Sequence, residues 1–143
     1  MADVEIKGLR ELLAAMKELP KAIEQKCLKV AVMTGANVIK RAAADLVVRR
    51  TGLVAKAVRI GFNKKESTPG KAVYHVFISS KVRGGKKKWP PFYWRYLEFG
   101  TVKMAAKPFM RPAFDSTNRE AAEVIKGKLA ERIEIEAARL GKR

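Results

Sequence analysis

The spacing of apolar residues changes near the start of the chain. Val4 and Ile6 alternate with charged residues, which predicts a short strand that ends at Gly8. The next apolar residues recur at helical intervals and form one face of a helix: Leu9, Leu12, Leu13 and Met16. Pro20 interrupts this pattern, so we expect the first helix to end shortly before it.

A second, longer helix is predicted after this break, because proline suits the first turn of a helix. Apolar residues recur in two neighbouring rows as far as Leu46, and we expect the helix to reach the Thr51-Gly52 pair, with Gly52 as its C-terminal cap. Several small residues would allow another backbone to approach closely: Ala31, Gly35, Ala36, Ala42, Ala43 and Ala44. That backbone is either the chain's own sheet, which we favour, or a helix of a second subunit.

Two stretches with a period of two follow the long helix. Residues 54–62 and 72–80 alternate between apolar and polar positions, and the polar segment 64–71 separates them. The pattern predicts an antiparallel hairpin. The aromatic run at residues 92–99, FYWRYLEF, is too short for its spacing to distinguish a third strand from a helical turn.

The last part of the chain predicts an amphipathic helix. Its apolar stripe consists of Phe114, Ala121, Ile125, Leu129, Ile133, Ala137 and Leu140. These elements together indicate a single domain over residues 1–143 with an α+β fold. We expect the long N-terminal helix and the C-terminal helix to pack on a small antiparallel sheet of three to four strands.

The segment before this last helix predicts a rigid bend. An element ends near Phe99, and Gly100 permits backbone angles that are closed to other residues. A short extended run then leads to Pro112, which suits the first turn of the closing helix. We expect the phenylalanines at positions 99, 109 and 114 to lie in the core.

Glu98 is the one acidic residue between positions 81 and 114, where nine basic residues occur. Two interpretations remain open for its side chain. It forms an ion pair with Arg95, with Arg111 or with a neighbouring subunit, and so fixes the bend. Otherwise it is a solvated side chain at the end of an element.

Basic residues exceed acidic ones by 17 over the 143 residues, and the excess is greatest in this same region. Residues 81–91 combine glycines, prolines and basic residues, which predicts an exposed loop. Such a cluster indicates a polyanion or an acidic protein as partner, although solubility alone would also explain it. Aromatic residues beside the cations can stack on bases or anchor a protein interface. The candidate contact residues are Lys81, Arg83, Lys86, Lys87, Lys88, Trp89 and Arg95.

Residues that support catalysis or metal binding are scarce in this sequence. His75 is the only histidine and lies within a predicted strand, and Cys27 is the only cysteine and lies on an apolar helix face. One histidine, one cysteine and no acidic cluster give no recognisable ligand spacing. We therefore predict that the protein is not an enzyme and has no cofactor, no metal and no small-molecule substrate.

The sequence also indicates the cellular compartment in which the protein is made. A lone cysteine cannot form an internal disulfide, which favours a reducing environment. The N-terminal residues lack the arrangement of a signal peptide, and no stretch of about 18 apolar residues occurs. We expect synthesis in the cytoplasm and no contact with a membrane.

The sequence of the bend resembles that of a known protein family. Glu98, Phe99, Gly100 and Thr101, followed by the run from Lys107 to Ala113, resemble the signature of tailed-phage minor tail components. These are usually described as tail-completion or head-to-tail joining proteins of siphophages and related prophages. The N-terminal half also resembles the family pattern, but Arg49 and Arg50 stand where the family commonly has a proline.

This resemblance implies a structural virion protein that acts at the neck or upper tail and joins the finished tail to the DNA-filled head as an oligomeric ring. It implies other neck and tail proteins, and further copies of the chain, as partners, with synthesis in the bacterial host cytoplasm. The residues expected to serve assembly are Glu98, Phe99, Gly100, Thr101, Pro108, Phe109, Arg111 and Pro112.

The role of the basic loop in such a ring stays open. Its cations would contact DNA phosphates without reading sequence, or an acidic face of a neighbouring neck or tail protein. The alternative function is a free, non-catalytic nucleic-acid-binding module that uses the basic aromatic loop. No helix-turn-helix, zinc-finger or RNA-binding motif supports it. A nuclease ranks third, because metal-binding acids are lacking.

Overall fold

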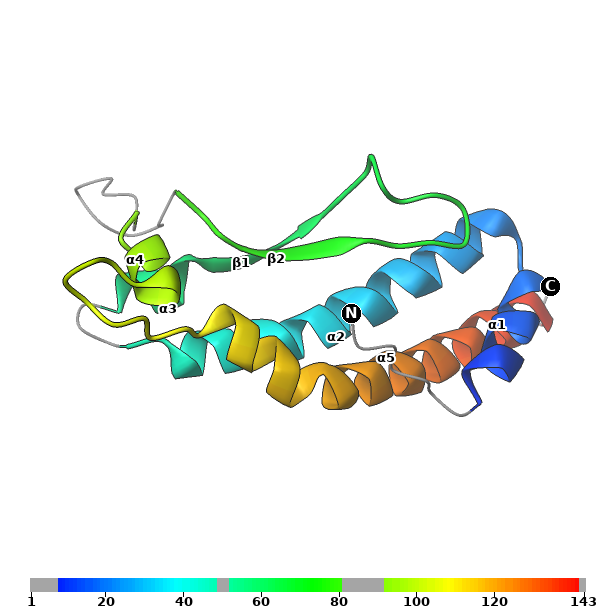
Figure 1. Ribbon diagram of the computed structural model, residues 1–143. Coiled ribbons are helices and arrows are strands. Elements are labelled where there is room, and N and C mark those ends of the chain that lie inside the picture. The colour runs from blue at the N-terminus through cyan, green and yellow to red at the C-terminus, as the bar shows by residue number, and fades with distance from the viewer. Residues whose placement is uncertain (1–7, 49–51, 81–91, 142–143) are drawn as a thin grey trace.

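The computed structural model describes residues 8–48, 52–80 and 92–141 of the chain. The elements follow in the order α1 (Leu9–Lys17), α2 (Lys21–Leu46), α3 (Leu53–Ala57), β1 (Val58–Phe62), β2 (Tyr74–Ile78), α4 (Trp94–Phe99) and α5 (Met110–Gly141). The long helices α2 and α5 run antiparallel and side by side, and α2 lies between α5 and the β1-β2 hairpin (Figure 1). Helices α3 and α4 lie at one end of the molecule, and α1 lies at the other.

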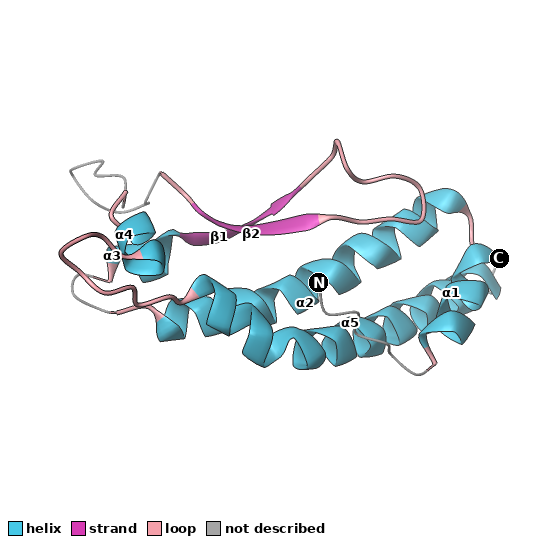
Figure 2. Ribbon diagram, in the orientation of Figure 1, coloured by secondary structure: helices cyan, strands magenta, loops and turns pink. Residues whose placement is uncertain are grey.

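The α+β class is confirmed, but the sheet has two strands among the described residues rather than three to four (Figure 2). The strands are antiparallel, as predicted, with a register that runs from Val58 opposite Ile78 to Phe62 opposite Tyr74. Residues 94–99 form a helix, and the backbone N–H of Gly100 donates to the C=O of Tyr96 at 2.9 Å. The strand predicted at residues 4–6 lies outside the described residues.

The boundary after α2 differs from the prediction. The helix ends at Leu46, because Val47 has an extended backbone and its side chain is buried. Gly52 has a φ of 70°, but it precedes α3 and its C=O accepts the N–H of Lys56 at 3.1 Å. Gly52 therefore begins the next helix instead of closing the long one. The strand is also shorter than predicted, since Val54 belongs to α3.

The small residues of α2 pack against α5 of the same chain, and those near its C-terminal end also pack against the hairpin, as predicted: Ala42, Ala43 and Ala44 belong to the same cluster as Val58, Val76 and Ile78. A Cβ atom on Gly35 would lie 2.3 Å from Cγ1 of Ile125 and 3.0 Å from the backbone oxygen of Ala121. Glycine thus brings the two helix backbones into close contact. The sequence predicted the closing helix, but not its contact with this face of α2.

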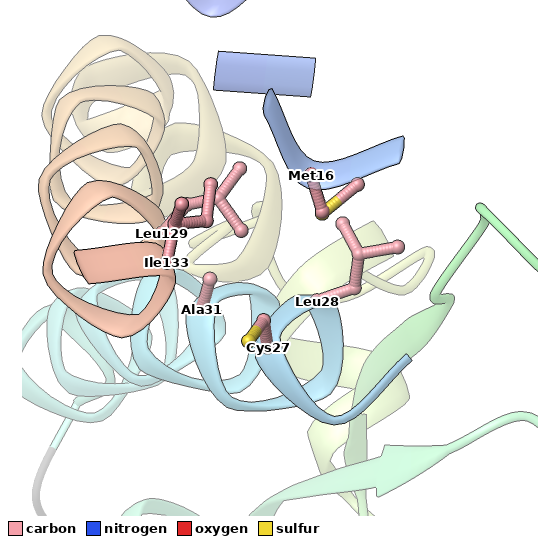
Figure 3. Close-up of a cluster of buried hydrophobic side chains, with 6 residues drawn as sticks. All are labelled: Met16, Cys27, Leu28, Ala31, Leu129 and Ile133. Carbon is pink, nitrogen blue, oxygen red and sulfur yellow. The ribbon is translucent and has the colours of Figure 1, made fainter. Parts of the chain in front are cut away.

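Two clusters of buried side chains hold the fold together. In the first, side chains from α1, α2 and α5 point toward one another: Met16, Cys27, Leu28, Ala31, Leu129 and Ile133 (Figure 3). The second joins the end of α2 to α3, the hairpin and the start of α5: Ala43, Val47, Val54, Val58, Phe109 and Ala113. This second cluster anchors the bend that precedes α5.

Candidate assembly surface

The carboxylate of Glu98 caps the start of α5. It accepts hydrogen bonds from the backbone N–H groups of Phe109, Met110 and Arg111, at 2.8, 3.1 and 3.3 Å. The next residue, Pro112, has no N–H. Glu98 therefore satisfies all the free backbone donors of the first turn, and its negative charge lies at the positive end of the helix dipole. Sequence analysis left Glu98 between an ion pair and a solvated side chain, and the structure gives it this third role.

Further backbone hydrogen bonds close the bend at its base. The N–H of Lys107 donates to the C=O of Leu97 at 2.7 Å. Thr101 and Met104 exchange hydrogen bonds of 2.8 and 3.2 Å across a tight turn. The segment between α4 and α5 is consequently fixed at both ends and within its turn.

Gly100 is required by this geometry. Its φ is 74°, and a Cβ atom there would lie 2.8 Å from the backbone nitrogen of Ala106 and 3.0 Å from the backbone oxygen of Met104. Any side chain would have to displace backbone atoms, and its residue would adopt an unfavourable backbone conformation. The bend predicted around Gly100 is therefore present.

The prediction that three phenylalanines lie in the core holds for one of them. Phe109 is fully buried, whereas Phe99 is 75% exposed and Phe114 is 48% exposed. In the short helix α4, Leu97 packs against the second cluster and Glu98 faces the start of α5. Phe99 follows on the remaining side of the helix, where it meets solvent.

Several large apolar side chains are exposed on residues 92–114. We call this set the apolar tip: Phe92, Tyr96, Phe99, Val102, Met104 and Phe114. Val102 is completely exposed at the turn between Thr101 and Met104. Tyr96 and Met104 also line a groove of about 720 Å³ beside α3. Large exposed apolar surfaces of this kind mark interaction sites in folded proteins.

The segments that carry the apolar tip also carry exposed cations. Arg95, Lys103, Lys107 and Arg111 are all exposed, and the Arg95 guanidinium lies 5.7 Å from the centre of the Trp94 ring. The only carboxylate among residues 92–114 is that of Glu98, which caps α5. The predicted contact residues Lys81, Arg83, Lys86, Lys87, Lys88 and Trp89 lie outside the described residues.

Among the described residues, the histidine and the cysteine lie outside the apolar tip. His75 is exposed on the hairpin, with its Nε2 2.7 Å from Nδ2 of Asn63. Cys27 is 2% exposed, and burial raises the pKa of its thiol, with the Glu136 carboxylate adding to the effect. The described residues hold no group of three or more metal-binding side chains, and none of their helices could span a bilayer.

Comparison with known proteins identifies the class as a phage tail component. Residues 10–100 match the family "Bacteriophage HK97-gp10, putative tail-component", and this span is more than half of the chain. The chain therefore belongs to the HK97-gp10-like family of tailed-phage tail components. Searches of curated proteins and of solved structures found no match. The family match includes Glu98, Phe99 and Gly100, while Thr101 and residues 108–112 lie beyond it.

Proposed function

We propose that this tail component acts at the neck or upper tail, where it completes the tail and joins it to the DNA-filled head as part of a ring. The chain serves as a structural assembly protein and carries out no reaction. The observation that supports this role is the apolar tip, held on a bend that Glu98 and Gly100 fix in one conformation. A rigid apolar surface buries area on docking at little cost in conformational entropy.

The exposed cations on the same segments give the docking its electrostatic component. Arg95 and the basic residues of segment 81–91 contact acidic protein surfaces of the junction, or the phosphates of DNA that passes through it. Contacts with phosphate are independent of sequence and weaken steeply as salt increases. Exposed phenylalanine and valine side chains at the tip gain nothing from phosphate, so docking to protein is the main function of this end.

A complementation experiment tests the proposal. A phage that lacks this chain receives either the wild type or the double variant Phe99→Ser/Val102→Ser. We expect the variant protein to fold normally, because both side chains are exposed, and infected cells to accumulate unjoined heads and tails. The control is Phe77→Ser, which changes a half-exposed phenylalanine on the hairpin. Normal yields of joined particles with the tip variant would disprove the proposed role.

A further inference from the structure

We infer that the apolar tip docks on helix α5 of a second copy of this chain, with Val102 placed against Gly127. This inference rests on the proposed function, since it names the partner of the tip within the ring. The receiving surface is the acidic row, which we define as Glu120, Glu123, Glu131 and Glu134 with Gly127 at its centre.

The members of the acidic row share one face of α5, because they are spaced by three, four, four and three residues. All five residues are exposed. Glu131 forms an ion pair with Lys128 at 2.8 Å. Glu120, Glu123 and Glu134 form no ion pair with any residue that the structure describes. Three of the four carboxylates in the row are therefore exposed and form no contact of this kind within the part of the subunit that the structure describes.

Gly127 gives this row an opening at its centre. No atom lies within 4 Å of the position that a Cβ would occupy, so the fold itself does not require glycine there. Glycine within a helix is nevertheless less stable than alanine, by about 1 kcal/mol. A close approach by another molecule accounts for it, because a side chain from outside can reach the helix backbone at this position.

The tip and the row match in charge and shape. The tip presents an exposed valine among Arg95, Lys103, Lys107 and Arg111, and the row presents a glycine among four carboxylates. This match is significant in a chain with 31 basic and 14 acidic residues, where exposed negative surface is scarce. A second copy of the chain thus offers the acidic rim that the cations of the tip require.

One subunit cannot satisfy this match internally. Met110 begins α5 next to the tip, and Gly127 lies 17 residues along the same helix, which is roughly 25 Å away at the α-helical rise. The two surfaces are therefore separate, and each subunit can use both at once. Contacts of this head-to-side type repeat from subunit to subunit and form a closed ring when the rotation between subunits permits.

Nucleic acid fits these observations less well than a second copy. A DNA backbone at the tip would leave Phe99 and Val102 in water and would leave the acidic row without a partner. Protein surface covers both the apolar residues and the charges around them. Binding of duplex DNA at the tip is accordingly an outcome that would contradict the inference.

Cysteine cross-linking in assembled particles tests the contact directly. The double variant Val102→Cys/Gly127→Cys should give a ladder of covalent multimers after mild oxidation, and reductant should remove it. Each single variant should give no ladder, because the two positions meet only across the interface. The native Cys27 is buried and does not interfere. Joined particles of the double variant without a ladder would overturn the inference.

Charge reversal gives a second, independent test on the purified full-length chain. A tip variant, Lys103→Glu/Lys107→Glu, and a row variant, Glu123→Lys/Glu134→Lys, should each lose the self-association of the wild type in analytical ultracentrifugation. Mixed in equal amounts, they should associate again, because the unchanged tip of one fits the unchanged row of the other and the two reversed surfaces also attract each other. A chain that carries all four changes should associate again. Full self-association by the row variant alone would overturn the inference.

The outcomes separate the inference from the proposed function. If the tip variant fails to join heads to tails while the row variant joins them normally, the tip docks on a different protein. The inference is then wrong, and the proposed function stands. If both variants join heads to tails normally, the tip has no role in joining, and the proposed function fails as well.

Discussion

Glu98 and Phe109 hold the bend between α4 and α5 from two sides. The carboxylate of Glu98 accepts the backbone N–H of Phe109 at 2.8 Å, while the ring of Phe109 is fully buried in the second cluster. The same residue is thus bound by a charge-assisted hydrogen bond at its backbone and by apolar packing at its side chain. The position of the apolar tip depends on this anchor.

Removal of the cap should destabilise the fold. We expect Glu98→Ala to lower the free energy of unfolding by about 1–2 kcal/mol, because the first-turn donors of α5 lose their acceptor. Glu98→Gln keeps one acceptor oxygen and should cost less. Urea unfolding followed by circular dichroism measures both. Glu123→Ala, an exposed position on α5, is the control and should stay within about 0.5 kcal/mol of wild type. Equal stability of Glu98→Ala and the control would refute the cap.

Two glycines should respond to alanine in opposite ways. Gly100→Ala should destabilise the protein by about 1–2 kcal/mol, because Gly100 has a positive φ and lies close to the backbone of Ala106. Gly127→Ala should stabilise it by up to about 1 kcal/mol, since that position has open space within a helix. Thermal unfolding of both variants checks the pair. Stabilisation by Gly100→Ala would show that the bend has a different geometry.

The contact between Gly35 and Ile125 should appear as coupling between mutations. Gly35→Ala places a methyl group where Cγ1 of Ile125 lies, so we expect a loss of about 1–3 kcal/mol from overpacking. In the Ile125→Ala background the same change should cost less, because the space is then free. A double-mutant cycle by denaturant unfolding measures the difference. Strictly additive effects would argue against this helix contact.

The two phenylalanines of the bend should differ in their contribution to stability. Phe109→Ala should cost about 3–5 kcal/mol, as expected for a fully buried aromatic side chain. Phe99→Ala should change stability by less than about 0.5 kcal/mol, because Phe99 is 75% exposed. Denaturant unfolding compares the two variants under the same conditions. A large loss of stability with Phe99→Ala would place its ring in the core.

The thiol of Cys27 should stay unreactive while the protein is folded. Burial raises its pKa above the ordinary value of 9.0, so the neutral thiol predominates at neutral pH and few reagents reach it. Alkylation should become rapid only when denaturant unfolds the chain. Because burial disfavours the thiolate, the fold is most stable while the Cys27 thiol is protonated, below pH 9.0. The free energy of unfolding should fall as the pH rises through the pKa that Cys27 has in the folded protein. Fast alkylation of the native protein would contradict the burial of Cys27.

The sequence was sufficient to predict those helices and strands in which apolar residues recur at a regular spacing. The rows of apolar residues predicted α1, α2 and α5, and the period of two predicted the antiparallel hairpin. Sequence patterns were less reliable where tertiary packing determines the backbone conformation. Val47 leaves the helix because its side chain is buried in the second cluster, and this burial depends on residues far along the chain. No local pattern contains that information.

The bend around Gly100 was predictable, but its mechanism was not. Gly100 and Pro112 predicted a turn followed by a helix, whereas the capping role of Glu98 acts across eleven residues. One signal pointed to it: the first turn of α5 has apolar Phe109 before it and no polar residue to serve as its own cap. The exposure of Phe99 follows from the orientation of Glu98, so one missed contact explains both differences.

The hydrogen bond between the N–H of Lys107 and the C=O of Leu97 affects which positions can change in evolution. It closes the segment 101–106 into a small loop whose side chains are all exposed, so those side chains contribute little to the stability of the helices beneath. Substitutions in this loop can therefore accumulate without affecting the folding of the helices. This separation would let related phages change the outer surface of the loop residue by residue while its base stays the same.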